Sequence, residues 1–462
     1  MTAPADPPLP SAPDTSGALE RRTLWAYALP ALGPALLYNL VVVMYLNFAT
    51  DQLGAAPGVI GAIFGLSKIW DAVSDPMAGY LSDRTRAGLG RRRSWLLGSA
   101  LPIAAFSLMA WAPPRSLEGT ALTVWIAVGI FGFYTAFTAA DVPHMALGAE
   151  LTVADRGGRN RLFAWRQLVR TLGMLGAFGI GTAVVAQPET GREGAFWLAS
   201  GVGLFSVAML AWGVWALPPE RPDFIARGAR NPFRAVMDVA GNPHARLLLF
   251  VFFIESMGTG AIGVLVPYVI RYVLELPTAF IPAMLLCYTV AAVAGIPFWV
   301  RLARVHEKRR LWLVAMLLSG FGFGLIFWVG PGDWPLMAIS GLIAGFGGAC
   351  GNTLGQALKA DVIDVDEYRT GERKEGAYFA AWSFAGKLAA GLMVAVVGFA
   401  LEATGYVANI EQPQEVRFAM VALMGGMPLA GYAFGALAFA RFRLSEAEHT
   451  RIRNELDARQ TP

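Results

Sequence analysis

Two carboxylates and one ammonium group lie inside an apolar run of the sequence, residues 56–81. The spacing of Lys68, Asp71 and Asp75 places their side chains on one face of a helix. An uncompensated charge at the centre of a bilayer costs about 2.5–3.5 kcal/mol, so three charges within two turns need partners or a watery cavity. Charges in this setting are typical of sites for a translocated ion or polar solute.

Further charges interrupt other apolar runs. Asp141, Arg166 and Lys387 lie in such runs, and Arg170 follows Arg166 by one turn. Together with the first run, they give three acids, Asp71, Asp75 and Asp141, and three bases, Lys68, Arg166 and Lys387. We expect this set to meet in one cavity, where a bound cation would release Lys387 from the carboxylates. The alternative is a network of buried salt bridges that only joins helices. Glu255 is a lone acid that either lines the cavity or is protonated and packed.

The composition indicates which elements position these charges. The chain of 462 residues is 55% hydrophobic and only 15% charged, with a mean hydropathy of +0.49, whereas soluble domains average about 25% charged residues. Apolar stretches long enough to cross a bilayer occur at 24–49, 56–81, 95–113, 120–150, 163–186, 195–217, 246–274, 278–302, 311–330, 334–358, 376–401 and 416–440. We therefore predict an all-α membrane protein with twelve transmembrane helices.

Basic residues gather in every second loop between these spans. The basic segments are 84–93, 156–161, 221–246, 304–310, 369–374 and the tail from Arg441, and the loops between them contain few bases, chiefly Arg115 and Arg192. Lys and Arg in short loops stay on the cytoplasmic side. Both termini are thus predicted to be cytoplasmic in a bacterial-type inner membrane. The net charge of +4 reflects this topology and gives no reason to expect nucleic-acid binding.

An internal duplication divides the chain. The segment 146–155, ALGAELTVAD, recurs as 357–366, ALKADVIDVD. Each copy closes the fourth helix of its half, which predicts two pseudo-symmetric six-helix bundles with a solute site where they meet. The predicted parts are a disordered cytoplasmic leader (1–20), an N-terminal bundle (21–217), a cytoplasmic linker (218–243), a C-terminal bundle (244–443) and a cytoplasmic tail (444–462).

Two motifs resemble a known family. The first is KIWDAVSDP (68–76), continued by GYLSDRTR (79–86) and GRRR (90–93), and the second is ADVID (360–364), followed by EYRTGER (367–373). They are similar to the signatures of the glycoside/pentoside/hexuronide:cation symporter (melibiose-permease-like) family of the major facilitator superfamily. The resemblance implies the major facilitator fold and cation-coupled symport by alternating access.

The resemblance also implies a cation site built from Asp71, Ser74, Asp75 and Thr138. Ser74 stands where the melibiose-type members have an asparagine, and a carboxylate pair can also hold a proton. The coupling ion is therefore left open between Na+ and H+, with no other metal and no cofactor expected.

Predicted solute contacts follow from the same resemblance. Asp141 and Arg166 match positions that bind sugar hydroxyls, and Lys387 matches a lysine that contacts the cation-site acids. Two sugar contacts differ, because Ala35 replaces an aspartate and Met145 replaces a stacking tryptophan. Lys68 and Met145 complete the predicted solute-binding set.

A cytoplasmic charge network is predicted to hold one face closed in one conformation and to break in the other. Its expected members are Asp83, Arg84, Arg92, Asp361, Asp364 and Arg373. The alternative is that these arginines act only as topology signals and that the acids are solvated loop charges.

Other classes find little support in the sequence. The four histidines are scattered without metal-ligand spacing, no Walker-type phosphate loop occurs, and no nucleophile-base pair indicates an enzyme. We predict a secondary transporter that moves a sugar or glycoside-like solute with a monovalent cation, as a monomer in contact with membrane lipid. The alternatives are a carrier of lysolipids or other amphiphiles on the same fold and, more remotely, a membrane sensor that does not transport.

Overall fold

The computed structural model describes residues 21–151, 156–184, 190–218, 220, 239, 241–371, 375–442 and 444–460, and these residues are almost entirely helical. Arg373 and the leader 1–20 lie outside the described residues. The first crossing is built from α1 (Arg21–Ala28), a 3-10 turn η1 (Leu29–Ala31) and α2 (Leu32–Asp51). The next five are α3 (Pro57–Arg84), α4 (Arg91–Trp111), α5 (Gly119–Leu151), α6 (Arg156–Val184) and α7 (Gly191–Ala216).

Six further crossings follow. They are α9 (Pro243–Tyr268) with the π-helical turn η3 (Val269–Val273), α10 (Phe280–Leu302), α11 (Lys308–Gly324) with η4 (Leu325–Trp328), α12 (Trp334–Thr370), α13 (Glu375–Ala403), and the broken helix α14 (Gln414–Val421), η5 (Ala422–Gly426) and α15 (Met427–Phe439). A final helix, α16 (Glu446–Gln460), ends the described chain.

Eleven helices in the described residues are long and apolar enough to cross a membrane. The twelfth crossing is α3, whose 28 residues also suffice. Its own charges at positions 68, 71 and 75 lower its hydropathy below that of an ordinary span. The prediction of twelve helices is therefore confirmed, and the least apolar of them is the one that contains the predicted cation site.

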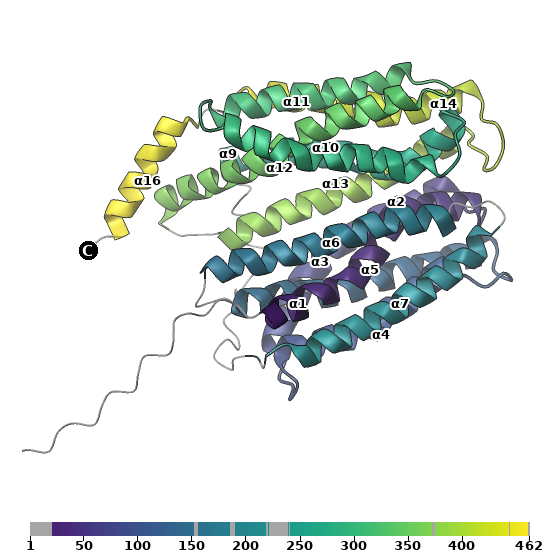
Figure 1. Cartoon of the computed structure of the whole chain (residues 1–462), viewed down its shortest axis with the longest axis horizontal. Coiled ribbons are helices and arrows are strands. Elements are labelled where there is room, and N and C mark those ends of the chain that lie inside the picture. Colours follow the sequence, from purple (N-terminus) through teal and green to yellow (C-terminus); the bar gives the residue numbers. More distant parts are fainter. Residues whose placement is uncertain are drawn as a thin grey trace, which may run out of the picture.

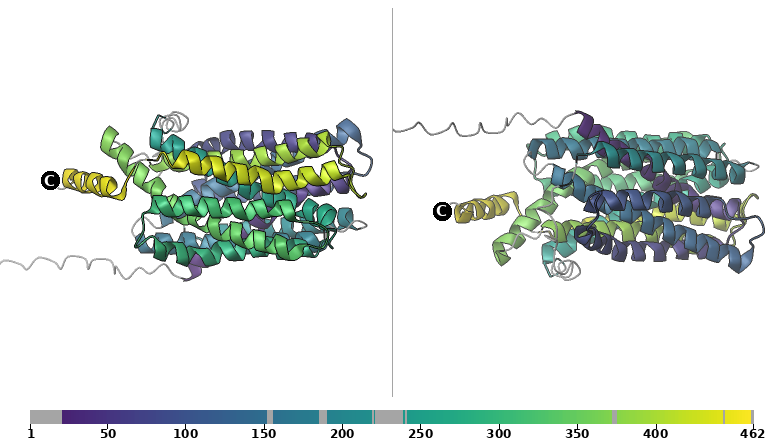
Figure 2. Two further views of the ribbon diagram at one scale, coloured as in Figure 1. Left: turned by 90° about the horizontal axis from the view of Figure 1, so that it is seen from above. Right: turned by 90° about the horizontal axis from the view of Figure 1, so that it is seen from below.

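The helices of the crossings run along one common axis in all three ribbon views (Figures 1 and 2), and α16 lies at an angle to them in Figure 1. In Figure 1 the helices of the first half, α1–α7, lie below those of the second half, α9–α15. We call the end with loops 85–90 and 303–307 and with α16 the basic end, which lies at the left of Figure 1. The opposite end, with loops 52–56, 274–279 and 404–413, is the distal end.

Local sequence explains several helix ends. Pro57 begins α3 directly after the extended residue Ala56, as expected for proline at a first helical position. Asn242 caps α9, because its side-chain oxygen accepts the backbone N–H of His244 at 3.0 Å. Gly371 ends α12 in a left-handed conformation with φ +71°, which glycine adopts without strain.

The two halves touch most closely along α3 and α13. A methyl group added at Gly61 would lie 3.0 Å from the Cα atom of Ala395, and one added at Gly398 would collide with the carbonyl of Pro57. Gly391 faces the stem of Lys68 just as closely. Small residues thus let the two backbones approach, and they bring the charged face of α3 against α13.

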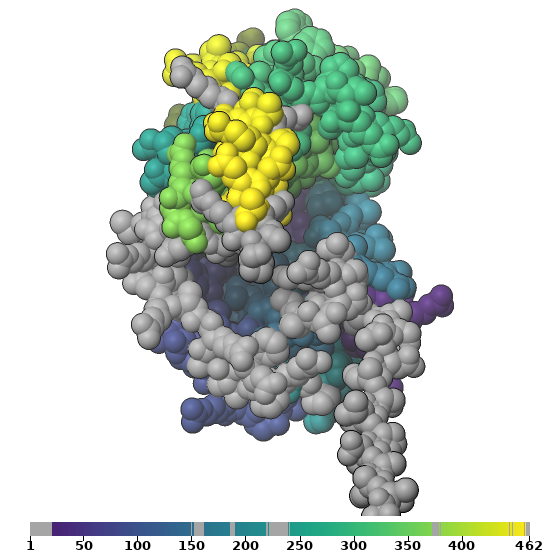
Figure 3. Space-filling view, turned by 90° about the vertical axis from the view of Figure 1, so that its left-hand side faces the viewer, coloured from purple at the N-terminus to yellow at the C-terminus, as the bar shows by residue number. Residues whose placement is uncertain are grey.

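Two segments differ from the expectation. The tenth span was predicted to end at residue 358, but α12 continues to Thr370, because a helix that leaves the membrane needs no apolar residues to persist. The tail was expected only as a cytoplasmic extension, whereas it forms α16 beside the end of α12 (Figure 3). The remaining predicted boundaries between domains stay predictions.

Candidate functional site

The charged face of α3 meets α5 and α13 in a compact cluster. Asp71 is only 1% exposed. The hydroxyl of Thr138 lies 2.8 Å from a carboxylate oxygen of Asp71 and 3.0 Å from one of Asp75. The ammonium group of Lys387 contacts Asp75 directly and lies 3.1 Å from Asp71. Two acids of the first half therefore share one base from the second half.

Lys68 completes this cluster from the same helix as the acids. Its Nζ atom lies 3.7 Å from Asp71, 3.4 Å from the hydroxyl of Tyr38 and 3.4 Å from the ring centre of Tyr134. The aromatic faces stabilise the ammonium group by cation-π attraction. Lys68 thus provides a positive charge next to Asp71, and its predicted role in solute binding stays a prediction.

Ser74 takes a different position from its predicted neighbours. Its hydroxyl donates to the backbone carbonyl of Asp71 at 3.2 Å, and across the described ranges no hydrogen bond joins it to either carboxylate. A hydroxyl that follows its own helix in this way is common for serine. The oxygen atoms gathered by the structure are thus those of Asp71, Asp75 and Thr138.

A second cluster lies one turn further along α5. Asp141 pairs with Arg166, which is 5% exposed, and with Arg170 at 2.7 Å. Thr138 and Asp141 are three residues apart on α5, so both clusters share one face of this helix. Two guanidinium groups on one carboxylate leave an excess of one positive charge here.

The two positions that differ from the family pattern also differ from each other in the structure. Met145 is 47% exposed on α5, so its side chain is accessible. Ala35 is buried, and its methyl group lies 3.1 Å from a Cβ built on Gly173 of α6. Met145 can therefore contact a ligand, whereas Ala35 packs α2 against α6.

At the basic end, the predicted network of the first half closes within that half. Asp83 accepts from Arg92 at 2.6 Å, and Arg92 also pairs with Glu150 at 2.7 Å. Glu220 accepts the backbone N–H of Arg92. Arg84 stays on its own helix, stacked over the ring of Tyr80.

The acids of the second half are held by an unforeseen partner. Asp361 pairs with Lys308 at 2.8 Å, and Asp364 accepts from His449 at 3.1 Å and Arg453 at 3.4 Å. His449 and Arg453 both belong to α16. No ion pair among the described residues of the basic end joins one half to the other.

The distal end has the opposite arrangement. Asp51 at the end of α2 accepts from Arg271 at 2.8 Å, from Tyr272 at 3.0 Å and from Tyr406 at 2.6 Å. The side chain of Asn409 donates to the Asp51 carbonyl at 2.9 Å. All four partners belong to the second half, so this one aspartate joins both halves. The sequence signal was weak, because an aspartate at a helix end resembles an ordinary solvated residue.

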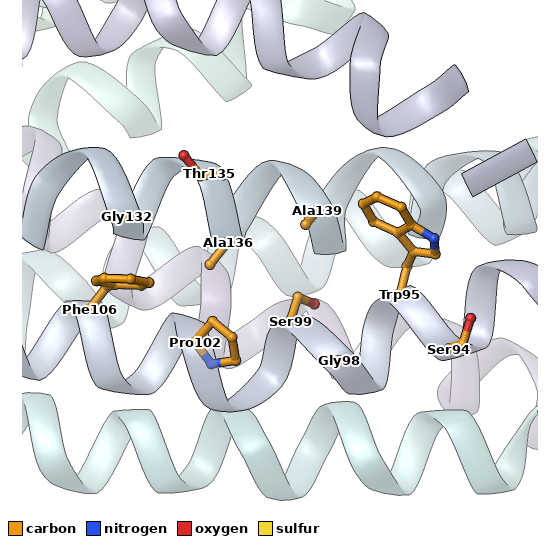
Figure 4. Close-up of a pocket in the computed structure, with 10 residues that line it drawn as sticks. All are labelled: Ser94, Trp95, Gly98, Ser99, Pro102, Phe106, Gly132, Thr135, Ala136 and Ala139. Carbon is orange, nitrogen blue, oxygen red and sulfur yellow. The ribbon is translucent and has the colours of Figure 1, made fainter. Parts of the chain in front are cut away.

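A groove of about 490 Å³ lies away from both clusters, between α4 and α5. Figure 4 shows Trp95, Pro102 and Phe106 on one side and Gly132 and Ala136 on the other. None of its lining residues belongs to the predicted cation or solute sites, and its wall is mainly apolar. It belongs to the outer surface of the first half.

The helices and the clusters between them define a membrane transporter of the major facilitator type. Among solved structures, the chain is similar to a bacterial homologue of the human lysosomal transporter Spinster, with a TM-score of 0.67, 12% identity, and 93% of this chain and 100% of the other covered. At this identity the similarity shows the fold alone.

Sequence comparisons identify the family. The model of the family described as "MFS/sugar transport protein" matches residues 26–446, and the chain belongs to this family. It is 26% identical to the isoprimeverose transporter of Lactiplantibacillus pentosus, over 92% of this chain and 89% of the relative. It is 25% identical to an uncharacterised symporter of Synechocystis, over 95% of this chain and 97% of the relative. The predicted resemblance to sugar and cation symporters is thus confirmed at the level of the family.

Proposed function

We propose that the protein is a symporter that couples the entry of Na+ or H+ to the movement of a sugar or glycoside-like solute. The observation that carries this proposal is the contact of Lys387, from the second half, with both carboxylates of α3. The relatives named as a symporter and as an isoprimeverose transporter support it.

The coupling step follows from charge balance. Asp71 and Asp75 carry two negative charges, and Lys387 supplies a compensating charge from α13. A cation that binds between the carboxylates and the Thr138 hydroxyl takes over this role, because hard cations prefer oxygen ligands. Lys387 is then released from α3, and the contact between the halves weakens at this point. A proton on one carboxylate would act in the same way.

The solute would bind to the neighbouring cluster. The Asp141 carboxylate accepts hydrogen bonds from solute hydroxyls, while Arg166 and Arg170 donate to solute oxygens. Because Asp141 already pairs with both arginines, a solute hydroxyl must displace one of them to reach the carboxylate. This exchange links solute binding to rearrangement of α5 and α6.

We infer from the arginine-rich loops that the basic end faces the cytoplasm of a bacterial cell, with both termini on that side. The contacts of Asp51 hold the distal end together, whereas the ion pairs of the described basic end stay within each half. This pattern supports an inward-open conformation, and a monomer contains every residue that the mechanism needs.

The amphiphile alternative would require an apolar path from the membrane to the charged clusters. The apolar groove of Figure 4 shares no lining residue with them. A sugar-like solute therefore remains our proposal, and lysolipid transport is an outcome that the following experiment can detect.

The test is uptake into proteoliposomes under a sodium or a proton gradient, with glycosides, uronides and lysolipids as candidate solutes. We expect one gradient to drive accumulation of a glycoside. Asp75→Asn should abolish gradient-driven accumulation, because the amide cannot balance Lys387 or a bound cation. Glu307→Gln, at an exposed ion pair with Arg310, is the matched control and should behave as the unmodified protein.

Normal accumulation by both Asp71→Asn and Asp75→Asn would contradict the cation site. Accumulation of lysolipids but of no glycoside would contradict the solute class. Absence of gradient-driven movement of every solute, in protein shown to be folded, would contradict symport itself.

A further inference from the structure

A buried lysine of the second half is not used by the proposed mechanism. Lys359 on α12 is 5% exposed. Its ammonium group lies 3.9 Å from the ring centre of Phe252 on α9 and 5.4 Å from that of Trp382 on α13. Within the described ranges it forms no ion pair and no hydrogen bond. Aromatic faces recover only part of the hydration that a buried ammonium group loses.

The fold does not require a cation at this position. In the internal duplication, Lys359 corresponds to Gly148 of the first half. A methyl group added at Gly148 would collide with the ring of Tyr27, so the first half uses the position for close packing. The second half places a charge there instead, and a charge without a counterion is costly in a membrane protein.

Lys359 lies close to the proposed coupling site. The Phe252 ring that holds it also packs 3.3 Å from a Cβ built on Gly386, the residue before Lys387. The lysine is therefore one aromatic ring away from α13.

Glu255, an acid of the second half, does not satisfy Lys359. Glu255 on α9 accepts from the indole N–H of Trp312 at 2.7 Å and lies against Gly351 of α12. Gly351 is about two turns further from the basic end than Lys359. The Glu255 carboxylate would repel a negative group from the level of Gly351. A negative group bound at Lys359 would therefore stay closer to the basic end.

We propose that Lys359, seated on Phe252 and Trp382, forms an anion subsite that binds a carboxylate, sulfonate or phosphate group of the solute. This inference rests on the proposed function and narrows it to solutes with both hydroxyl groups and one oxyanion. The excess positive charge of Arg166 and Arg170 over Asp141 favours the same class of solute.

The test compares a matched pair of probes, methyl glucuronide and methyl glucoside, on the full chain. The chain has few lysines, namely Lys68, Lys308, Lys359, Lys374 and Lys387, so acylation of each can be followed by mass spectrometry. We expect the glucuronide, but not the glucoside, to slow acylation of Lys359 several-fold. Acylation of Lys308, which pairs with Asp361 at the basic end, should be unchanged and serves as an internal control.

Variants provide a second readout. Lys359→Met should weaken glucuronide binding about 10- to 100-fold, the usual effect of losing a charge-assisted hydrogen bond, and change glucoside binding less than about twofold. Lys359→Arg should restore most of the preference. Arg310→Gln, at a side chain that is 80% exposed, is the matched surface control.

The possible failures are distinguishable. If neither acylation of Lys359 nor the ratio of the two affinities responds to the acid group, the subsite is refuted even where glycoside uptake is normal. If the glucuronide protects Lys359 but no solute is transported, the subsite stands and the proposed symport is refuted.

Discussion

The two ends of the molecule are held together in different ways. At the distal end, one carboxylate, Asp51, binds Arg271, Tyr272 and Tyr406 of the other half. At the basic end, Asp83 pairs with Arg92 and Asp364 pairs with His449, and each of these two pairs lies within one half. The first arrangement must break when the halves separate, whereas the second can persist.

This difference suggests which contacts set the conformational equilibrium. A salt bridge that exists in both the open and the closed state stabilises both equally and shifts nothing. Only contacts that cross between the halves bias the equilibrium. We therefore expect substitutions at the distal end to change accessibility and substitutions in the described networks of the basic end to change local stability.

The largest effect is expected for Asp51→Asn. The amide has no charge to pair with Arg271, and its single oxygen cannot accept hydrogen bonds from Tyr272 and Tyr406 as the carboxylate does. Each charge-assisted hydrogen bond contributes about 1.5–3 kcal/mol. Labelling of a cysteine at Val43, which packs across the interface against Gly263, should rise at least about tenfold in a background with Cys287 and Cys350 replaced by serine. Glu118→Gln, in an exposed loop of the distal end, is the control. Unchanged labelling in Asp51→Asn would contradict the conclusion that the contacts of Asp51 hold the distal end closed.

An intermediate and purely local effect is expected for Asp364→Asn. It weakens the contacts of His449 and Arg453, but Ile452 and Leu456 keep an apolar face of α16 buried. Tryptic cleavage within α16 should accelerate about threefold to tenfold, with Glu448→Gln as the exposed control. Labelling at Val43 should not change, and a rise there would mean that α16 takes part in opening the distal end.

The smallest effect is expected for Glu402→Gln. The carboxylate accepts the backbone N–H of Gly58 at 2.8 Å, a single bond between the halves at the distal end. The amide oxygen can still accept this bond, so only the charge contribution is lost. Labelling at Val43 should rise no more than about threefold, corresponding to less than about 1 kcal/mol. An effect as large as that of Asp51→Asn would argue against Asp51 as the main contact.

Sequence reasoning succeeded where the physical signal is local. Apolar runs of about twenty residues predicted the crossings, because backbone groups in a membrane must bond within a helix. The charged run on α3 predicted a cluster of buried charges, and the structure places Asp71, Asp75, Thr138 and Lys387 in contact. Their roles in binding remain predictions.

Sequence reasoning failed where two segments that are far apart in the chain contact each other. Asp51 lies more than 200 residues from Arg271, and neither residue interrupts an apolar run in an unusual way. The docking of α16 depends on His449 meeting Asp364, a pairing that no periodicity encodes. The end of α12, residues 359–370, was missed because hydropathy detects lipid contact and does not detect the helix itself.

The close approach of α13 to α3 has a consequence for the ions. Gly391 leaves room for the aliphatic stem of Lys68, whose ammonium group balances Asp71. Adding a single methyl group at this glycine would push the stem aside and move a positive charge without altering any ionisable residue. The packing of the two halves and the affinity for the coupling ion thus depend on the same contact. A purely apolar substitution in this interface can change the affinity for the ion.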